Sequence, residues 1–429
     1  MMLLYNILSF LLLPFYLILL IFRVIIGKED VRRIGERFGI GHKNLKKNTT
    51  LVWIHVASVG ESVIALTLIK NINNLWRKKI MPKTLLRFLV TSGTVSSAKI
   101  LQQNLPKNAN HQFVPIDNII FVRAFFKNWK PNLGIFIESE LWPCLINEGK
   151  AYCKLLLINA RISDKSFKSW QKISGFFKLI TVNFSKIIVQ STKDLQKFTQ
   201  LGVTNVLNFG NIKFAHKKLL VNDKNVSVLS KHMAGRRVIV FASTHLEDEK
   251  VLLNIIKPIK ELHPNCYFIL IPRHPERKNS IIKSCVKLNL SCSISSEQNI
   301  PILSDDLYIV DQFGELGLFF SVAYISFIGG SFKQGGHNLL EPAYFSNYIL
   351  FGPNMSNYTN IANEMIDRRA AIQIKDQSDL LNKINYFLSK NGIKEAEIYQ
   401  NNALEFVNNN KQILDNYLMV IEKYLLKQE

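Results

Sequence analysis

Residues 329–341 have the sequence GGSFKQGGHNLLE, which follows an apolar run, 323–328, predicting a buried strand, and leads into a helical pattern near Asn338. A glycine-rich turn between a strand and a helix start lets backbone N–H groups approach an anion, and the helix dipole favours negative charge there. Glu341 would then lie where a carboxylate meets a ribose diol. The stretch predicts a nucleotide-binding turn; the alternative is a glycine-tightened turn whose Glu341 only interacts with the dipole.

Strands and helices alternate on both sides of this stretch. Apolar runs predict strands at 51–56, 87–91, 133–137, 155–158, 186–190 and 206–208, with a short edge at Phe113, and later at 238–242, 266–271, 308–310 and 348–351. This spacing predicts mainly parallel sheets covered by helices on both faces. Ligands bind such sheets outside the carboxyl ends of the strands. We therefore expect functional residues directly after strands.

A polar, lysine-rich segment with little apolar periodicity interrupts the alternation and predicts a linker. The expected fold is α/β, with two Rossmann-like domains facing a cleft. The expected boundaries are 1–27 for an N-terminal membrane anchor, 28–212 for the first domain, 213–236 for the linker, 237–390 for the second domain and 391–429 for C-terminal helices.

The N-terminal segment is almost continuously apolar through residue 27, with Arg23 its only charge. Residues 1–22 are long enough to span a bilayer, and they lack the basic start and cleavage site of a removable signal peptide. A basic cluster follows and predicts a cytoplasmic location for that side. We expect a single anchor helix; a half-inserted hairpin kinked at Pro14 and a buried helix of the soluble fold are the alternatives.

The composition is strongly basic, with 54 Lys+Arg against 32 Asp+Glu and a formal net charge of +22. Such an excess indicates an anionic partner: nucleic acid, an acidic lipid surface or a phosphorylated substrate. Basic residues are not interleaved with aromatic ones as in RNA-binding motifs, which disfavours nucleic acid. The five cysteines lack CxxC spacing, which predicts reduced thiols rather than disulfides or structural zinc.

Several common motifs are absent. The chain has no GxxxxGK[ST], no strand-coupled GxGxxG and no HExxH, which disfavours nucleotide hydrolysis, nicotinamide binding and zinc hydrolysis. No DxD motif falls at a strand end, so the sequence favours a metal-free transferase.

Three glutamates follow strands of the first domain. Glu61 opens a helix and could take a proton from a hydroxyl; alternatively it only satisfies free amides at the helix start. Glu138 and Glu140, one strand period apart, would perturb each other's titration if held close. Alternatively each pairs with an arginine or lysine of its own domain.

Two cations are further candidates. Arg273 lies in a stiff, proline-flanked basic loop suited to phosphate, although a solvated basic turn is the alternative. Lys213, at the domain junction, could reach an anion in the cleft, whereas most such lysines are merely solvated.

An ordered set of motifs resembles the Kdo transferase family (glycosyltransferase family 30), the 3-deoxy-D-manno-octulosonic acid transferases of lipopolysaccharide biosynthesis. The resemblance extends from the anchor to about residue 369. The motifs are WIHVASVGE (53–61), TSGTVSSAK (91–99), ESELWPCLI (138–146), NARIS (159–163), GNIKF (210–214), PRHPER (272–277), FGELG (313–317) and GGSFKQGGHNLLEPA (329–343).

The resemblance implies a GT-B fold, an inverting, metal-independent mechanism with no cofactor, the donor CMP-Kdo and a lipid A precursor such as lipid IVA as acceptor. It implies that Glu61 is the general base, and that Glu138 or Glu140, with Lys213, stabilises the transition state. The first domain would bind the acceptor and the second the donor. The residues implied to bind CMP are Pro272, Arg273, Phe313, Gly314, Glu315, Asn338, Leu339, Leu340 and Glu341.

The resemblance also implies a single-pass or monotopic protein of the bacterial inner membrane, with its catalytic domains on the cytoplasmic face. One position departs from the family: Cys144 stands where an asparagine usually follows Trp-Pro. Two alternatives to this function stay open, another GT-B nucleotide-sugar enzyme (a UDP-sugar transferase or epimerase) and a non-catalytic lipid-binding membrane protein. The motifs do not fix how many Kdo residues are added.

Overall fold

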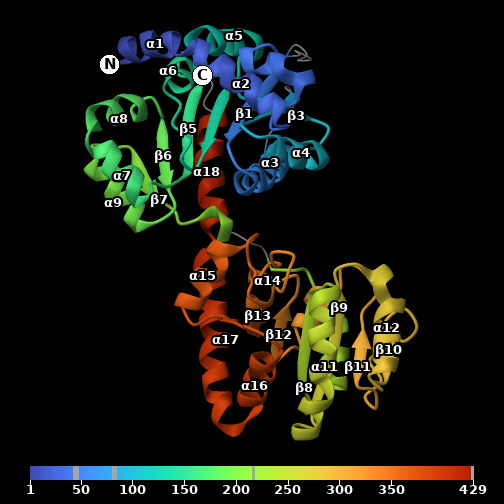
Figure 1. Cartoon of the computed structure of the whole chain (residues 1–429). Helices are drawn as coiled ribbons and strands as arrows, with labels where there is room; N and C mark the ends of the chain where they lie inside the picture. Colours follow the sequence, from blue (N-terminus) through green and yellow to red (C-terminus); the bar gives the residue numbers. More distant parts are fainter. Residues whose placement is uncertain (42–47, 80–84, 215–217, 427–429) are drawn as a thin grey trace. The chain divides into compact units, whose positions relative to one another are not determined.

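A computed structural model describes residues 1–41, 48–79, 85–214 and 218–426 of the chain. The chain divides into two compact units, Met1–Ile212 with Gln412–Glu429, and Lys213–Lys411. Each unit contains a seven-stranded sheet whose neighbouring strands run parallel, with helices packed on both faces (Figure 1). The two doubly wound sheets confirm the expected α/β class with the two Rossmann-like domains of a GT-B fold.

The first sheet has the strand order β3-β2-β1-β4-β5-β6-β7. All its strands are parallel, but successive strands are added on one side of β1 up to β3 and on the other side from β4 onward, so the switch point lies between β1 and β4. Its central strands are almost entirely buried, as expected for a parallel sheet covered on both faces. The strands are β1 Thr49–Val56, β2 Leu85–Ser92, β3 Ala109–Phe113, β4 Leu133–Ile137, β5 Lys154–Ala160, β6 Lys186–Val189 and β7 Val206–Asn208.

Local sequence signals start several helices of the first unit. Side chains of Thr94, Asn118, Ser163 and Ser191 accept hydrogen bonds from backbone N–H groups of the helices that they precede. The helices are η1 Val31–Phe38, α3 Val59–Lys79, α4 Val95–Asn104, α5 Ile119–Trp129, α6 Pro143–Gly149, α7 Asp164–Gln171, α8 Ser174–Thr181, α9 Thr192–Gln200 and α18 Ile413–Leu426.

The second sheet repeats this design with the order β10-β11-β9-β8-β12-β13-β14, and its switch point falls between β8 and β12. The strands are β8 Arg237–Thr244, β9 Cys266–Pro272, β10 Cys292–Ile294, β11 Leu307–Ile309, β12 Ile325–Ile328, β13 Tyr348–Phe351 and β14 Ile372–Gln373. The helices are η2 Ile212–Phe214, α10 Asp223–His232, α11 Leu246–Leu262, η3 Pro275–Arg277, α12 Lys278–Lys287, α13 Leu316–Phe320, α14 Leu340–Ala343, α15 Thr359–Asp367, α16 Gln377–Leu388 and α17 Lys390–Asn410.

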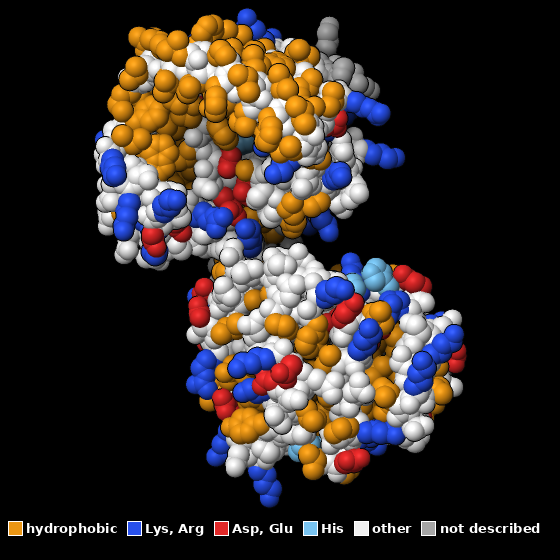
Figure 2. Space-filling model, in the orientation of Figure 1, with side chains coloured by type: hydrophobic (Ala, Val, Ile, Leu, Met, Phe, Trp, Pro, Cys, Tyr) orange, Lys and Arg blue, Asp and Glu red, His pale blue; other side chains and the backbone are white. Residues whose placement is uncertain are grey.

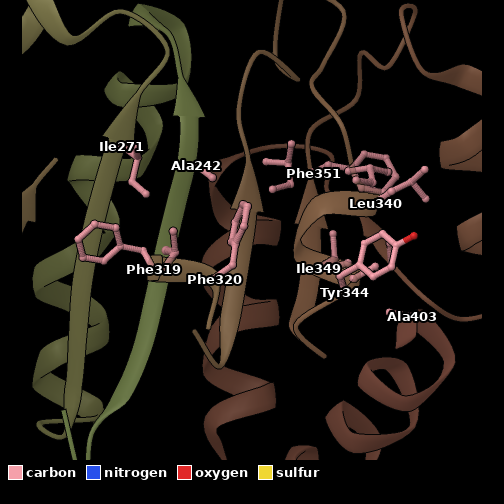
Figure 3. Close-up of a cluster of buried hydrophobic side chains, with 14 of the residues drawn as sticks. Ala242, Ile271, Phe319, Phe320, Leu340, Tyr344, Ile349, Phe351 and Ala403 are labelled. Atoms are coloured by element: carbon pink, nitrogen blue, oxygen red, sulfur yellow. The ribbon is translucent and has the colours of Figure 1, made fainter. Parts of the chain in front are cut away.

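Alternate residues of β8 and β9 point to opposite faces of the second sheet and enter two separate cores. One core packs against α11, α12 and α16, and the other against α13, α14, α15 and α17. Figure 3 shows the second core, in which Phe319 and Phe320 of α13 lie near the sheet residues Ile271 and Ala242, and Leu340 of α14 lies near Phe351.

The segment 213–236 is not a linker in its described residues. It forms most of η2 and all of α10, and Leu229 and Met233 are buried in a core of the second unit. The segment was predicted to be a linker because most of its residues are polar, and only one side of α10 is apolar. Residues 215–217 lie outside the described residues.

The C-terminal helices do not form one group. Helix α17 belongs to the second unit, whereas α18 returns to the first, where it packs against α3 and β5. The hydroxyl of Tyr417 donates to the carbonyl of Gly210 at 3.0 Å, and that of Tyr424 to Ser185 at 3.2 Å. The expected boundary at residue 391 therefore does not match this division, because the chain changes units at 411–412.

The apolar N-terminus forms two helices, α1 Met2–Leu11 and α2 Leu13–Ile25, bent by 54° at the break. Pro14 lies in the first turn of α2 and lacks the N–H that a continuous helix would need. The expectation of one continuous anchor helix is therefore wrong. Among the described residues, no single helix has the length and apolar composition to cross a bilayer; the bent pair has both only when its two helices are counted together.

Helix α1 packs on the first unit rather than standing apart from it. The Tyr5 hydroxyl donates to Asp117 at 2.8 Å, and the Tyr5 ring lies 5.9 Å from that of Phe176. The Cys144 thiol donates to the Asn6 side chain at 3.2 Å. These contacts join α1 to the loop before α5, to α6 and to α8, so residues 1–27 are not a separate body in this structure.

Candidate functional site

The carboxyl ends of β1 and β4 carry the candidate carboxylates of the first unit. These two strands are parallel neighbours, with His55 in register with Phe136, and the switch point of the sheet lies between them. The segments that follow them therefore leave the sheet side by side. Glu61 comes from the first, and Glu138 and Glu140 come from the second, close enough for both to raise the pKa of Glu61. The structure thus brings together three residues predicted from sequence.

Glu61 is buried, with 5% of its surface exposed. Its carboxylate accepts hydrogen bonds from the Ala57 N–H and the Ser58 hydroxyl, both at 2.7 Å, so it does satisfy donors before α3. Burial is the main cause that raises its pKa; the two hydrogen bonds lower it and the charges of Glu138 and Glu140 raise it further. The carboxylate therefore combines the helix-start role with a pKa shifted toward neutrality, as a general base requires.

Glu138 is held by the NARIS loop. The Arg161 guanidinium lies 2.8 Å from its carboxylate, so the pairing with an arginine of the same unit is present. Glu138 has φ +63°, a left-handed backbone that is uncommon for residues other than glycine. Extended structure ends at Ile137, so the two-residue strand period used to place Glu138 and Glu140 on one side does not apply beyond that point.

Glu140 has a histidine ring and an indole beside it instead of a guanidinium. His55 Nε2 lies 3.5 Å from its carboxylate, and the Trp142 indole N–H donates to it at 2.7 Å. Burial alone would raise the pKa of Glu140, but the interactions with His55 and Trp142 outweigh it and hold the pKa below its ordinary value. Glu140 is thus kept ionised beside a Glu61 that is easier to protonate.

Lys213 lies in η2 and is the first residue of the second unit. The preceding residue, Ile212, is fixed in the first unit, where its N–H donates to the Asn159 side chain at 3.0 Å. Asn159 and Arg161 belong to the same NARIS motif. This loop therefore holds both Glu138 and the chain just before Lys213.

In the second unit, the glycine-rich turn leaves the sheet between β12 and α14. A Cβ at Gly329 would lie 2.6 Å from the Ser243 carbonyl oxygen, and Gly330 has φ +67°, so both positions require glycine. The buried Asp248 carboxylate accepts hydrogen bonds from the N–H groups of Gly330 at 2.7 Å and His245 at 2.8 Å. Asp248 therefore fastens the turn to the start of α11.

Three histidines surround this turn, and the sequence analysis did not single them out. The rings of His245 and His337 stack at 5.3 Å with their Nε2 atoms 3.0 Å apart, and His274 lies edge-on to His245 at 5.6 Å. Burial, then the charges of His245, Arg273 and His274, lower the pKa of His337 to about 4. The sequence feature that could have predicted this cluster is the presence of a histidine directly after β8, another after β9 and a third in the glycine-rich stretch.

The residues expected to bind the nucleotide lie in three loops of the second unit, at the carboxyl ends of its strands. Pro272 ends β9, and the exposed Arg273 donates its N–H to the Thr244 carbonyl at 3.0 Å. Phe313, Gly314 and Glu315 precede α13; Phe313 is 75% exposed and Gly314 has φ +90°. An exposed aromatic ring and a flexible glycine leave this loop accessible to a flat base.

The third loop differs in part from expectation. The Asn338 side chain accepts from the Leu340 N–H at 3.0 Å and donates to Glu341 at 3.4 Å. Leu339 and Leu340 are almost fully buried, so only their backbone groups could contact a ligand (Figure 3 shows Leu340 in the core). Burial raises the pKa of Glu341, against the lowering effects of Asn338 and Arg273. Helix α14 has four residues, so the helix dipole contributes less than expected.

Two further observations concern the wider site. Within the described ranges, no group of three or more His, Cys, Asp or Glu side chains is arranged to hold a metal ion. Cys144 is buried, and its N–H donates to Asp117 at 3.1 Å beside that of Leu145 at 2.8 Å. Asp117 therefore holds the start of α6 through its backbone, while the Cys144 thiol contacts Asn6.

Comparisons with known proteins show which family the chain is similar to. The family model described as 3-deoxy-D-manno-octulosonic-acid transferase (kdotransferase) matches residues 32–216. Proteins named 3-deoxy-D-manno-octulosonic acid transferase from Rickettsia felis and Rickettsia bellii are 57% and 58% identical, and each match covers 99% of this chain and 100% of the relative. The C-terminal CMP-Kdo binding domain of WaaA from Acinetobacter baumannii is 28% identical over 44% of this chain and 96% of that domain, with a TM-score of 0.39.

Proposed function

The chain belongs to the 3-deoxy-D-manno-octulosonic acid (Kdo) transferase family of glycosyltransferases, and from this premise we propose that it transfers Kdo from CMP-Kdo to a lipid A precursor such as lipid IVA. The observation that carries the proposal is the carboxylate cluster at the switch point between β1 and β4. There a buried Glu61 has a raised pKa, and two further carboxylates lie within electrostatic range.

In the proposed mechanism, Glu61 removes the proton from a hydroxyl of the lipid acceptor while the oxygen of that hydroxyl forms a bond to the anomeric C2 of Kdo. The bond between C2 and the phosphate oxygen breaks on the opposite face, so the configuration inverts and CMP leaves. Positive charge develops on the sugar as this bond breaks, and the carboxylates of Glu138 and Glu140 are suited to stabilise it. Lys213 is proposed to act on the departing phosphate.

The second unit is proposed to bind CMP. Arg273 supplies a cation, and the glycine-rich turn, which Asp248 holds through the Gly330 N–H, lets the backbone approach the nucleotide closely. The carboxylate of Glu341 is suited to the ribose diol, and the exposed ring of Phe313 to the base. No step of this mechanism uses a metal or a cofactor, so we expect turnover to continue in the presence of a chelator.

We further propose that α1 and α2 dock the enzyme on the cytoplasmic face of the bacterial inner membrane, where the lipid acceptor resides. Figure 2 shows hydrophobic side chains gathered over this part of the first unit, with acidic side chains in a recess below. A basic protein with an exposed apolar face is attracted to an anionic bilayer and inserts that face into it. The exposed apolar residues of the two helices include Leu3, Leu4, Ile7, Phe10, Leu11, Phe15, Ile18, Ile21, Phe22 and Ile25.

The test is CMP release by the purified protein with freshly generated CMP-Kdo and lipid IVA. Release that depends on the lipid, and a product lipid heavier by whole Kdo units, would support the proposal, and the mass would give the number of units. Binding of CMP without turnover would exclude lipid IVA as the acceptor. Competition by UDP rather than CMP would favour a UDP-sugar enzyme, and binding of neither nucleotide would favour a non-catalytic lipid-binding protein.

A further inference from the structure

A chain of buried polar groups lies directly behind Glu140. The Trp53 indole N–H donates to Thr91 Oγ1 at 2.9 Å, and the same oxygen lies 3.0 Å from His55 Nδ1. The other ring nitrogen, His55 Nε2, lies 3.5 Å from the Glu140 carboxylate. Trp53, His55 and Thr91 are each no more than 1% exposed, so water does not satisfy these groups.

The chemistry of these groups determines which ring nitrogen of His55 carries a proton. An ionised carboxylate only accepts hydrogen bonds, so the nitrogen facing Glu140 must be Nε2–H. In a neutral ring, Nδ1 is then bare and must accept, and the Thr91 hydroxyl is its donor. An indole N–H only donates, so the Thr91 oxygen accepts from Trp53. The Thr91 hydroxyl proton is then donated to Nδ1 of His55. One arrangement satisfies Trp53, Thr91 and Nδ1 of His55, and it directs the Nε2–H of His55 at the Glu140 carboxylate 3.5 Å away.

The packing around His55 leaves the ring little freedom. His55 on β1 is in register with Thr91 on β2 and with Phe136 on β4, and its ring lies edge-on to Phe136 at 5.4 Å. The charged groups that face it are Glu140, from the loop after β4, and Asp117, from the loop after β3. Asp117 is occupied by the backbone N–H groups that begin α6 and by Tyr5.

We propose that His55 is a positioning residue of the transferase, which directs its Nε2–H at Glu140 and orients that carboxylate beside Glu61, while Thr91 and Trp53 fix the tautomer of the His55 ring. This inference rests on the proposed function. Glu138 differs, because its charge is already offset by Arg161 at 2.8 Å. Glu140 is directed by a histidine ring at 3.5 Å and not by a guanidinium at 2.8 Å, so it is the better placed of the two carboxylates to stabilise a positively charged transition state.

Two matched pairs of variants test the role of His55. Glutamine can place an amide N–H near the position of Nε2, whereas asparagine reaches only the position of Nδ1. We therefore expect His55→Asn to lower kcat about a hundredfold, as misplacement of a catalytic group by about 1 Å does, and His55→Gln to recover most of it. Thr91→Val should lower kcat in the same way, and Thr91→Ser should not.

The readouts separate positioning from folding. The His55→Asn and Thr91→Val variants should keep the wild-type KM for CMP-Kdo and the wild-type affinity for CMP. The acid side of their kcat–pH profile should gain a second ionisation, that of Glu140, because Glu140 loses the donor that lowers its pKa. Equal losses in all four variants, tracking their melting temperatures, would overturn the proposal.

A measurement on the wild type does not depend on turnover. With 15N-labelled histidine, the nitrogen shifts of His55, assigned by their absence in His55→Gln, should show a protonated Nε2. A ring protonated only on Nδ1 would overturn the inference even in a fully active enzyme. Failure of the wild type to release CMP would overturn the proposed function itself, whereas normal turnover with an unchanged kcat and pH profile in His55→Asn would overturn only the role of His55.

Discussion

Both units have a seven-stranded parallel sheet with a switch in strand order near its centre, yet the two switch points carry opposite chemistry. At β1 and β4 the first unit gathers three glutamates, two of them almost fully buried. At β8 and β12 the second unit gathers histidines, Arg273 and the glycine-rich turn that Asp248 holds. The same topological feature, a switch point, therefore carries groups that handle protons and positive charge in one unit and groups suited to an anion in the other. Topology places a site, and the side chains after the strands decide its chemistry.

The largest effect should come from the first unit. Glu61→Gln should lower kcat by about a hundredfold to ten-thousandfold, the usual contribution of a general base, and leave CMP affinity unchanged. The measurement is CMP release under saturating lipid. Asp379→Asn is the matched control, because Asp379 accepts the Lys375 N–H at a helix start in the second unit and no substrate is proposed there. Full activity of Glu61→Gln would leave Glu61 with its helix-start role only.

The corresponding change in the second unit should affect binding. Arg273→Ala should weaken CMP affinity by about tenfold to a hundredfold, the range for a hydrogen bond to a charged group, and it should act before the chemical step. Isothermal titration with CMP measures this, with Lys287→Ala at the exposed end of α12 as a control. An unchanged affinity in Arg273→Ala would mean that the basic loop is only a solvated turn.

Only the first unit should bind membranes. Replacing Leu4 and Ile18 together by aspartate should reduce sedimentation with anionic phospholipid vesicles by at least about tenfold, since each exposed side chain loses its apolar burial in the bilayer. The control replaces Leu262 and Val286, which are similarly exposed in the second unit, by aspartate. Equal losses in the two double variants would indicate that binding follows net charge rather than the apolar face.

A smaller effect concerns pH. Because Glu138 and Glu140 help to raise the pKa of Glu61, removing either charge should lower that pKa. The base must be deprotonated to work, so the acid limb of kcat/KM should move to lower pH in Glu138→Gln. The control is Glu148→Gln. Glu148 lies on α6 and pairs with Arg123 of α5, so its loss should leave the acid limb in place. A shift to higher pH in Glu138→Gln would contradict the proposed coupling.

The smallest effect is on stability. A carboxyl whose pKa is raised on folding contributes stability below its ordinary pKa and loses it as pH rises through the folded value. Glu61→Gln should therefore melt higher than the wild type at pH 8, by about 2–4 °C for each kcal/mol, and the difference should vanish near pH 4. Thermal unfolding at both pH values checks this. A lower melting temperature at pH 8 would mean that hydrogen bonds to Ala57 and Ser58 outweigh the burial of charge.

Sequence patterns predicted every strand except the short edge strands β10 and β14, together with the residues directly after the strands, because period and turn chemistry are local. That is why Glu61, Glu138, Glu140 and the glycine-rich turn were found. What the sequence did not predict depends on non-local packing. His55 seemed to be an ordinary strand residue until its register with Thr91 was known. Leu340 lies within a predicted binding motif, but it belongs to the core.

Helix assignment failed for the same reason. The apolar side of α10 has too few residues to predict a helix from sequence alone. Leu229 and Met233, which are buried in a core of the second unit, were therefore assigned to a linker. The pattern of α18 predicted a helix but could not indicate which sheet it packs against. In the N-terminal run, hydrophobicity predicted continuity, and the break near Pro14 depends on one backbone donor that the residue lacks.

The return of α18 to the first unit determines how the chain can be divided and in what order it can fold. Residues 213–411 are, in topological terms, an insertion within the first unit, so the second unit is continuous in sequence and the first is not. During synthesis the second unit can fold as soon as it leaves the ribosome, but the first gains its last helix only at the end. A fragment ending at residue 411 would expose the surfaces of α3 and β5 that α18 covers, whereas 213–411 can be excised as one piece.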